Sequence, residues 1–185
     1  ERTSSATGSG RVIAAMLALM LLAFALRLVN LDAFGFWTDE GLTPLRSGYA
    51  VSEILSNRIY IQEAISQDTH PPLYYLLLHL WMGLGGEDEA WVRALSGLCG
   101  TATIPVIYLL GRRLADEKVG LLTALILAVS PFHVRFGQEA RMYALLALNA
   151  ALALYGLACL LTDRRSALAW LGYVTFTAAT VWSHN

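Results

Sequence analysis

Apolar positions along the chain gather into long runs instead of alternating with polar ones. A helix needs about 20 mostly apolar residues to cross the hydrocarbon core of a bilayer. Segments of nearly that length cover residues 12–29, 91–110, 119–134, 142–161 and 167–182. The pattern predicts an all-α, polytopic transmembrane protein. It consists of a flexible N-terminal stretch, residues 1–11, and a transmembrane domain over residues 12–185.

One further apolar run, Pro71–Leu84, is too short for the same role. At about 1.5 Å per residue it reaches roughly 21 Å, against a hydrocarbon core of about 30 Å. Pro71 and Pro72 suit the start of a helix, because a proline there lacks only a donor that has no helical partner anyway. Trp81 suits the headgroup level of a membrane. We therefore expect an interfacial helix inside a large loop, residues 30–90.

The basic residues of the loops predict the orientation. Lys and Arg accumulate in cytoplasmic loops. If residues 71–84 do not cross, the N-terminus, Arg112-Arg113 with Lys118, and Arg164-Arg165 all fall on one side. We therefore expect a plasma (inner) membrane protein with a cytoplasmic N-terminus and loop 30–90 on the external, periplasmic side. A signal peptide is the alternative for the first run, but no small-residue cleavage pattern follows it.

Composition supports a membrane protein and argues against a nucleic-acid partner. Hydrophobic residues make up 56% of the chain and charged residues 15%, against about 25% charged in typical soluble domains. The net charge of -1 argues against the basic patch of a nucleic-acid binder. Cys99 and Cys159 both lie in apolar runs, which disfavours a disulfide framework. The abrupt end after an apolar run suggests the N-terminal part of a longer protein.

The external side carries most of the candidate chemistry. Ionisable residues that pack near a bilayer surface are costly to desolvate, so their grouping on one face favours a site. Each has a structural alternative: acidic residues often cap helices, and arginines often snorkel to headgroups. The candidates are Asp39, Glu40, His70, His133, Arg135, Gln138, Glu139, Arg141 and His184.

These residue types suit transfer of a group from a membrane-bound phosphate ester. An aspartate near the interface can act as general base on a hydroxyl or amine. Arginine and histidine can hold a phosphate by charge-assisted hydrogen bonds. The sequence contains no Walker-type loop, dinucleotide fingerprint or His-Glu-x-x-His zinc motif. It therefore gives no indication of a soluble nucleotide substrate or of a zinc peptidase.

Three motifs in order resemble those of a known family. They are Trp37-Thr38-Asp39-Glu40 after the first span, His70-Pro71-Pro72-Leu73-Tyr74-Tyr75, and Phe136-Gly137-Gln138-Glu139-Ala140-Arg141-Met142-Tyr143. The sequence resembles, from about Arg27 onward, the N-terminal half of GT-C glycosyltransferases that use polyprenyl-phosphate sugars. The protein O-mannosyltransferases and the lipid A aminoarabinose transferases belong to this superfamily.

The resemblance implies an inverting membrane glycosyltransferase of the cell envelope. It would move a sugar from a polyprenyl-phosphate-linked donor to a hydroxyl or amine of a lipid, glycan or protein acceptor. Asp39 is then the general base, with Glu40 beside it.

The resemblance also implies that His70, Arg135, Glu139, Arg141, Tyr143 and His184 contact the substrates. Some relatives have an acidic, metal-contacting residue at this position, whereas this sequence has His70. The departure leaves open whether a divalent metal is a cofactor. Several relatives place an aspartate where Tyr143 stands, so a second acidic role falls to Glu139 or to no residue.

Two other functions compete with the enzyme. A transporter would also carry ionisable groups in its membrane domain, but normally near the midplane and on broken helices. Here the candidate residues gather at one face, which counts against transport. A non-catalytic, lipid-binding protein that keeps the fold without the reaction is the remaining alternative.

Overall fold

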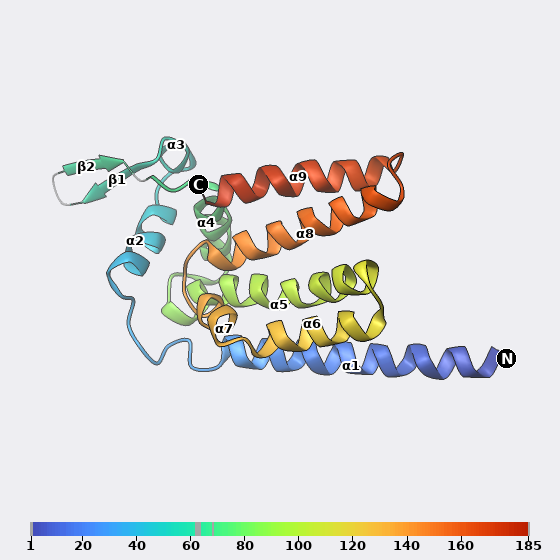
Figure 1. The fold of residues 1–185 in the computed structure, drawn as a ribbon. Coiled ribbons are helices and arrows are strands. Elements are labelled where there is room, and N and C mark those ends of the chain that lie inside the picture. The colour runs from blue at the N-terminus through green and yellow to red at the C-terminus, as the bar shows by residue number, and fades with distance from the viewer. Residues whose placement is uncertain (1, 62–63, 68, 185) are drawn as a thin grey trace.

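The chain forms a bundle of long helices with a smaller subdomain at one end (Figure 1). The computed structural model describes residues 2–61, 64–67 and 69–184. The bundle consists of α1 (Arg2–Leu28), α5 (Glu89–Leu114), α6 (Glu117–Val129), α8 (Tyr143–Thr162) and α9 (Ala167–Ser183). The helical, polytopic fold expected from the sequence is confirmed.

Length and apolar composition identify the helices that can cross a membrane. Within the described residues these are Gly10–Leu28 of α1, α5 and α8. A fourth is added if α6 and α7 (Pro131–Gly137), which are bent by 60° relative to each other, form one broken span. α9 has 17 residues, which is at the lower limit for a span. The predicted crossing by residues 167–182 therefore stays a prediction.

The break between α6 and α7 has a simple local cause. Pro131 has no backbone N–H, so it cannot continue the hydrogen bonds of α6. Ser130 ends α6 and caps α7, where its hydroxyl accepts from the N–H of His133. The apolar run at residues 119–134 is therefore not one straight helix. After the bend, Arg135, Gln138 and Glu139 line a pocket together with residues of the segment 30–40.

The loop over residues 30–90 contains the subdomain. It has three helices, α2 (Thr38–Ser47), α3 (Val51–Leu55) and α4 (Leu73–Gly85), and a hairpin of β1 (Arg58–Ile61) and β2 (Ala64–Gln67). The two strands are antiparallel, with Arg58 opposite Gln67. The sequence analysis did not anticipate the hairpin. α4 is the expected helix in this loop, and its 13 residues fall short of a span.

Buried apolar side chains attach α4 to the bundle. Tyr74, Leu78, Val92, Met142 and Leu145 form one cluster between α4, α5 and α8. At the far end of α4, two stacked indole rings whose centroids lie 4.3 Å apart, those of Trp81 and Trp91, join it to α5. Each indole N–H donates to the other residue's carbonyl, at 2.8 and 2.9 Å. This double contact fixes the position of α4 against α5.

Candidate active site

Glu40 and Arg93 form a buried, two-point ion pair between α2 and α5. Arg93 Nε lies 2.8 Å from Glu40 Oε1, and Arg93 Nη2 lies 2.7 Å from Glu40 Oε2. The Glu40 side chain is 1% exposed and that of Arg93 is 8% exposed. Glu40 Oε1 also accepts from the N–H of Ala140 at 2.7 Å. This carboxylate is therefore fully engaged in joining three segments of the chain.

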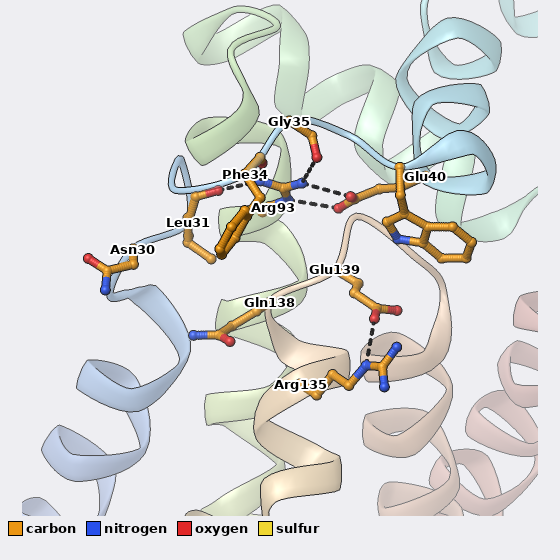
Figure 2. Close-up of a pocket in the computed structure, with 10 residues that line it drawn as sticks. Asn30, Leu31, Phe34, Gly35, Glu40, Arg93, Arg135, Gln138 and Glu139 are labelled. Atoms are coloured by element: carbon orange, nitrogen blue, oxygen red, sulfur yellow. Dashed lines mark hydrogen bonds and ion pairs between the residues drawn. The ribbon is translucent and has the colours of Figure 1, made fainter.

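Arg93 also organises the segment that enters α2. Its guanidinium donates to the carbonyls of Leu31, Phe34 and Gly35. Figure 2 shows Arg93 between this segment and Glu40. A buried charge is tolerated when its hydrogen bonds are satisfied, and these contacts use all three guanidinium nitrogens. Arg93 therefore sets the path of the backbone toward Asp39 and Glu40.

Asp39 has a different environment from its neighbour. It lies in the first turn of α2 and is exposed. Within the described part of the chain, its carboxylate has no hydrogen-bond or ion-pair partner. Its backbone carbonyl accepts from Arg141 Nη1 at 2.8 Å. The backbone of Asp39 is thus held in place while its carboxylate stays available.

An open pocket of about 350 Å³ adjoins this acidic pair. Ten residues line it, and they come from the end of α1, the entry to α2, α5 and α7 (Figure 2). They are Asn30, Leu31, Phe34, Gly35, Trp37, Glu40, Arg93, Arg135, Gln138 and Glu139. Trp37 is 48% exposed. Asp39 is not a lining residue, but it lies between the lining residues Trp37 and Glu40 in the sequence.

Arg135 is the exposed cation of this pocket. Its side chain is 75% exposed, and its Nε lies 3.1 Å from Glu139 Oε1, one helical turn later. Arg141, in contrast, is 8% exposed and donates to Asp39. Two of the predicted arginines therefore differ in what they can contact. Arg135 can reach a ligand in the pocket, whereas Arg141 supports the backbone beneath Asp39.

The predicted aromatic and histidine residues gather around the end of α9. The rings of His70 and His184 lie 5.6 Å apart between centroids, and those of Tyr143 and His184 lie 5.9 Å apart. The Arg141 guanidinium lies 5.9 Å from the centre of the Tyr143 ring. This group connects to Asp39 through Arg141. The structure thus brings the predicted site residues into two adjoining groups.

Arg27 and Arg93 are two buried arginines near the candidate site that the sequence analysis did not include among its candidates. Arg27 donates to the carbonyls of Ala23, Leu127 and Ala128, and to His133 Nδ1 at 2.8 Å. It therefore holds the ends of α1 and α6 together beside the pocket, and it explains the position of His133. The available signal was their charge: an arginine inside an apolar run needs a partner. The sequence did not reveal which partner.

The described residues contain no group of three or more His, Cys, Asp or Glu side chains that could hold a metal ion. His70 and His184 alone supply two imidazoles near each other. Structural and catalytic metal sites usually use three or four protein ligands. The residues described therefore do not form a complete metal site.

The comparisons with known proteins decide the family. Residues 69–183, more than half of the chain, match the family described as "Dolichyl-phosphate-mannose-protein mannosyltransferase". The chain belongs to this family. The match covers α4 through α9 and includes His70, Arg135, Glu139, Arg141 and Tyr143. The resemblance to GT-C glycosyltransferases that the sequence motifs indicated is confirmed.

A solved structure supports the same fold for this family member. It is the crystal structure of the Archaeoglobus fulgidus oligosaccharyltransferase in the apo form, with a TM-score of 0.65 and 16% sequence identity. The similarity covers 92% of the present chain and 23% of the other. The chain thus spans about a quarter of that protein's length. No curated protein matches the sequence.

Proposed function

We propose that this chain is the catalytic N-terminal part of a membrane glycosyltransferase. The enzyme moves a sugar from a polyprenyl-phosphate-linked donor to an acceptor hydroxyl or amine of a lipid, glycan or protein. The reaction takes place on the external side of the membrane. The observation that carries the proposal is the unequal state of two neighbouring carboxylates: Glu40 is buried and bonded, whereas Asp39 is exposed and unbonded among the described residues. Family membership supplies the reaction class.

Asp39 acts as the general base in this proposal. Its carboxylate accepts the proton from the acceptor hydroxyl or amine while the acceptor oxygen or nitrogen attacks the anomeric carbon of the sugar. The bond between that carbon and the phosphate oxygen breaks as the new bond forms. Because this is a single displacement from the opposite face, the configuration at the carbon inverts. The polyprenyl phosphate leaves as an anion.

The pocket and Arg135 suit the phosphate of the leaving polyprenyl phosphate. The pocket's volume of about 350 Å³ falls within the range of small-molecule sites. Arg135 is well exposed and can donate charge-assisted hydrogen bonds to the phosphate oxygens, while Glu139 orients its guanidinium. Trp37 presents a half-exposed indole at the same pocket, against which a sugar ring can pack. His70, Tyr143 and His184, whose rings lie close together near the end of α9, contact the acceptor in this proposal.

The two buried arginines of the membrane helices do not favour transport. Arg27 and Arg93 both lie in helices that can span the membrane. Both bond to backbone carbonyls, and their other partners are His133 and Glu40. A residue that lines a transport path must be able to exchange partners with its cargo. These two arginines are instead engaged with the protein.

The test is sugar transfer by the full-length protein in liposomes, with a polyprenyl-phosphate-linked sugar as donor. Replacing Asp39 by Asn removes the base and keeps the shape. We expect turnover to fall by at least about a hundredfold, the typical contribution of a general base. Asp32→Asn is the matched control, because Asp32 is exposed in the same loop. Equal turnover in Asp39→Asn and the parent would remove Asp39 as base. Absence of transfer or hydrolysis with every donor would favour a non-catalytic, lipid-binding protein.

A further inference from the structure

A second polar pocket lies at the opposite end of the bundle from the candidate active site. It measures about 280 Å³ and is lined by Leu109, Arg112 and Arg113 of α5 and by Tyr155 of α8. Arg93 and Arg113 lie on the same helix, so the two ends are separated by about 30 Å, close to the thickness of the hydrocarbon core. Figure 1 shows the α5–α6 and α8–α9 turns at this end, away from α2, α4 and α7.

The two arginines of this pocket are in different states. Arg113 reaches across to α8, where its Nε donates to the carbonyl of Ala158 at 3.1 Å and its Nη2 donates to the hydroxyl of Thr162. Arg112 is exposed, and its guanidinium makes no hydrogen bond or ion pair with the described residues. The pocket therefore combines one oriented guanidinium with a second whose donors are available.

The surrounding charge favours an anion. Lys118, Arg164 and Arg165 are exposed in the adjoining turns, as are Asp116, Glu117 and Asp163. Two of these three carboxylates are already bonded to backbone: Asp116 accepts from the N–H of Val119, and Asp163 accepts from the N–H of Arg165. Neither carboxylate forms an ion pair with Arg112 or Arg113 among the described residues.

The apolar side of the pocket distinguishes a lipid from a soluble anion. Leu109 lines the pocket and is 39% exposed, on a helix that can span the membrane. Leu114 and Leu161, at the same end of α5 and α8, are 65% and 69% exposed. An amphipathic ligand can place its phosphate against the arginines and its chains against these leucines. A free phosphate uses only the polar part.

We propose that this pocket binds the headgroup phosphate of an anionic phospholipid. Arg112 and Arg113 donate charge-assisted hydrogen bonds to the phosphate oxygens, and the Tyr155 hydroxyl donates to the same group. The acyl chains lie along Leu109. Basic pockets between helices at the cytoplasmic end are a recurrent form of lipid recognition. The site is independent of the function proposed above, since it lies at the other end of the bundle.

A simpler role for these arginines makes a different prediction. Basic residues in the last turn of a helix complement its dipole and hold the protein's orientation in the membrane. In that case every basic residue of this face attracts anionic lipid about equally, through diffuse charge. If the pocket is a specific binding site, substituting Arg112 or Tyr155 should weaken lipid binding more than substituting a basic residue outside the pocket.

The test measures binding of spin-labelled phosphatidylglycerol to the full-length protein in phosphatidylcholine vesicles. Arg112→Gln removes one free guanidinium, and Tyr155→Phe removes only the hydroxyl. Arg165→Gln is the matched control, with the same loss of charge on the same face. We expect Arg112→Gln to lower the association of the labelled lipid by at least about tenfold, the effect of one charge-assisted hydrogen bond. Arg165→Gln should change it less than twofold.

Three outcomes would overturn the proposal. An equal loss in Arg112→Gln and Arg165→Gln would show diffuse attraction, and no loss in Arg112→Gln would show no site. Displacement of the labelled lipid from the parent by millimolar inorganic phosphate would show that the pocket takes a free phosphate. If Arg112→Gln does not fold, Tyr155→Phe decides, since it keeps both charges: a weaker association supports the site and an unchanged one contradicts it.

Discussion

Glu40 and Arg93 meet through two hydrogen bonds, of 2.7 and 2.8 Å, although 53 residues separate them in the sequence. The pair makes the two adjacent carboxylates of the loop unequal. It holds Glu40 at the junction of α2, α5 and the turn before α8, and it leaves Asp39 as the carboxylate at the surface.

Breaking this pair from one side should destabilise the protein. Arg93→Gln leaves the carboxylate of Glu40 buried without its partner, which typically costs about 3–5 kcal/mol. We expect a clear fall in the thermal unfolding midpoint in detergent. Arg135→Gln is the control, because the exposed pair of Arg135 and Glu139 contributes at most about 1 kcal/mol. Equal midpoints for the two variants would contradict the structural role of Arg93.

Substitutions of Asp39 and of Glu40 should affect the stability of the protein to different extents. Asp39→Asn changes an exposed side chain and should shift the unfolding free energy by less than about 0.5 kcal/mol. Glu40→Gln removes one charge from the buried pair and should destabilise by several times that amount. Thermal unfolding of both variants beside the parent gives the comparison. A larger loss for Asp39→Asn than for Glu40→Gln would reverse the roles assigned here.

The close crossing of α5 and α6 depends on glycine. A Cβ at Gly120 would lie 2.6 Å from the carbonyl oxygen of Tyr108, and backbone cannot yield as a side chain can. We therefore expect Gly120→Ala to cost about 1–3 kcal/mol through overpacking. Gly172→Ala is the matched control, since a Cβ there meets nothing within 4 Å. Unfolding free energies that agree within error would show that the two helices can separate without loss.

A polar contact between α8 and α9 positions the chain before His184. Asn149 Nδ2 donates to the Ser183 hydroxyl at 3.2 Å, and both side chains are buried. Hydrogen bonds between membrane helices contribute about 0.6 kcal/mol on average. A double-mutant cycle with Asn149→Ala and Ser183→Ala should return a coupling of that size. Additive effects of the two changes would mean that apolar packing alone fixes α9.

Arg27 should control the bend between α6 and α7. Its guanidinium donates to the carbonyls of Leu127 and Ala128, at the end of α6. A glutamine at position 27 cannot donate to both carbonyls and to His133 at once. We therefore expect the orientation of α7 relative to α6 to become more variable in Arg27→Gln. Spin labels at the exposed positions Leu125 and Phe132 should then give a broader distance distribution. Arg11→Gln, an exposed change on α1, should leave the distribution as in the parent.

The sequence predicted the long apolar helices because their signal is local. The predicted spans at residues 12–29, 91–110 and 142–161 coincide with the three described helices that are long and apolar enough to cross a membrane. A contiguous apolar run of about 20 residues is sufficient to predict such a helix. The short run at residues 71–84 was expected to be an interfacial helix, and it forms α4, too short to span the membrane. The hairpin of β1 and β2 was missed, since two four-residue strands leave little pattern in the sequence.

The sequence indicated which residues to consider for the candidate site but not how they contact one another. Residue type and order grouped Asp39, Arg135 and His184 in one hypothesis. The sequence did not show that Arg141 would turn toward the backbone of Asp39 while Arg135 stayed exposed. Contacts between residues a hundred positions apart depend on how helices pack, and that packing has no local signature.

The sequence by itself determined that this chain is a helical membrane protein and placed its candidate chemistry at one end. Hydrophobic length and the order of three short motifs were sufficient, because both are properties of contiguous residues. Only the tertiary structure decided which carboxylate is bonded. In the sequence, Arg93 is a single charged residue within an apolar segment, and nothing near it in the sequence identifies its partner. The fold places Glu40 beside it, and the two side chains form a buried ion pair.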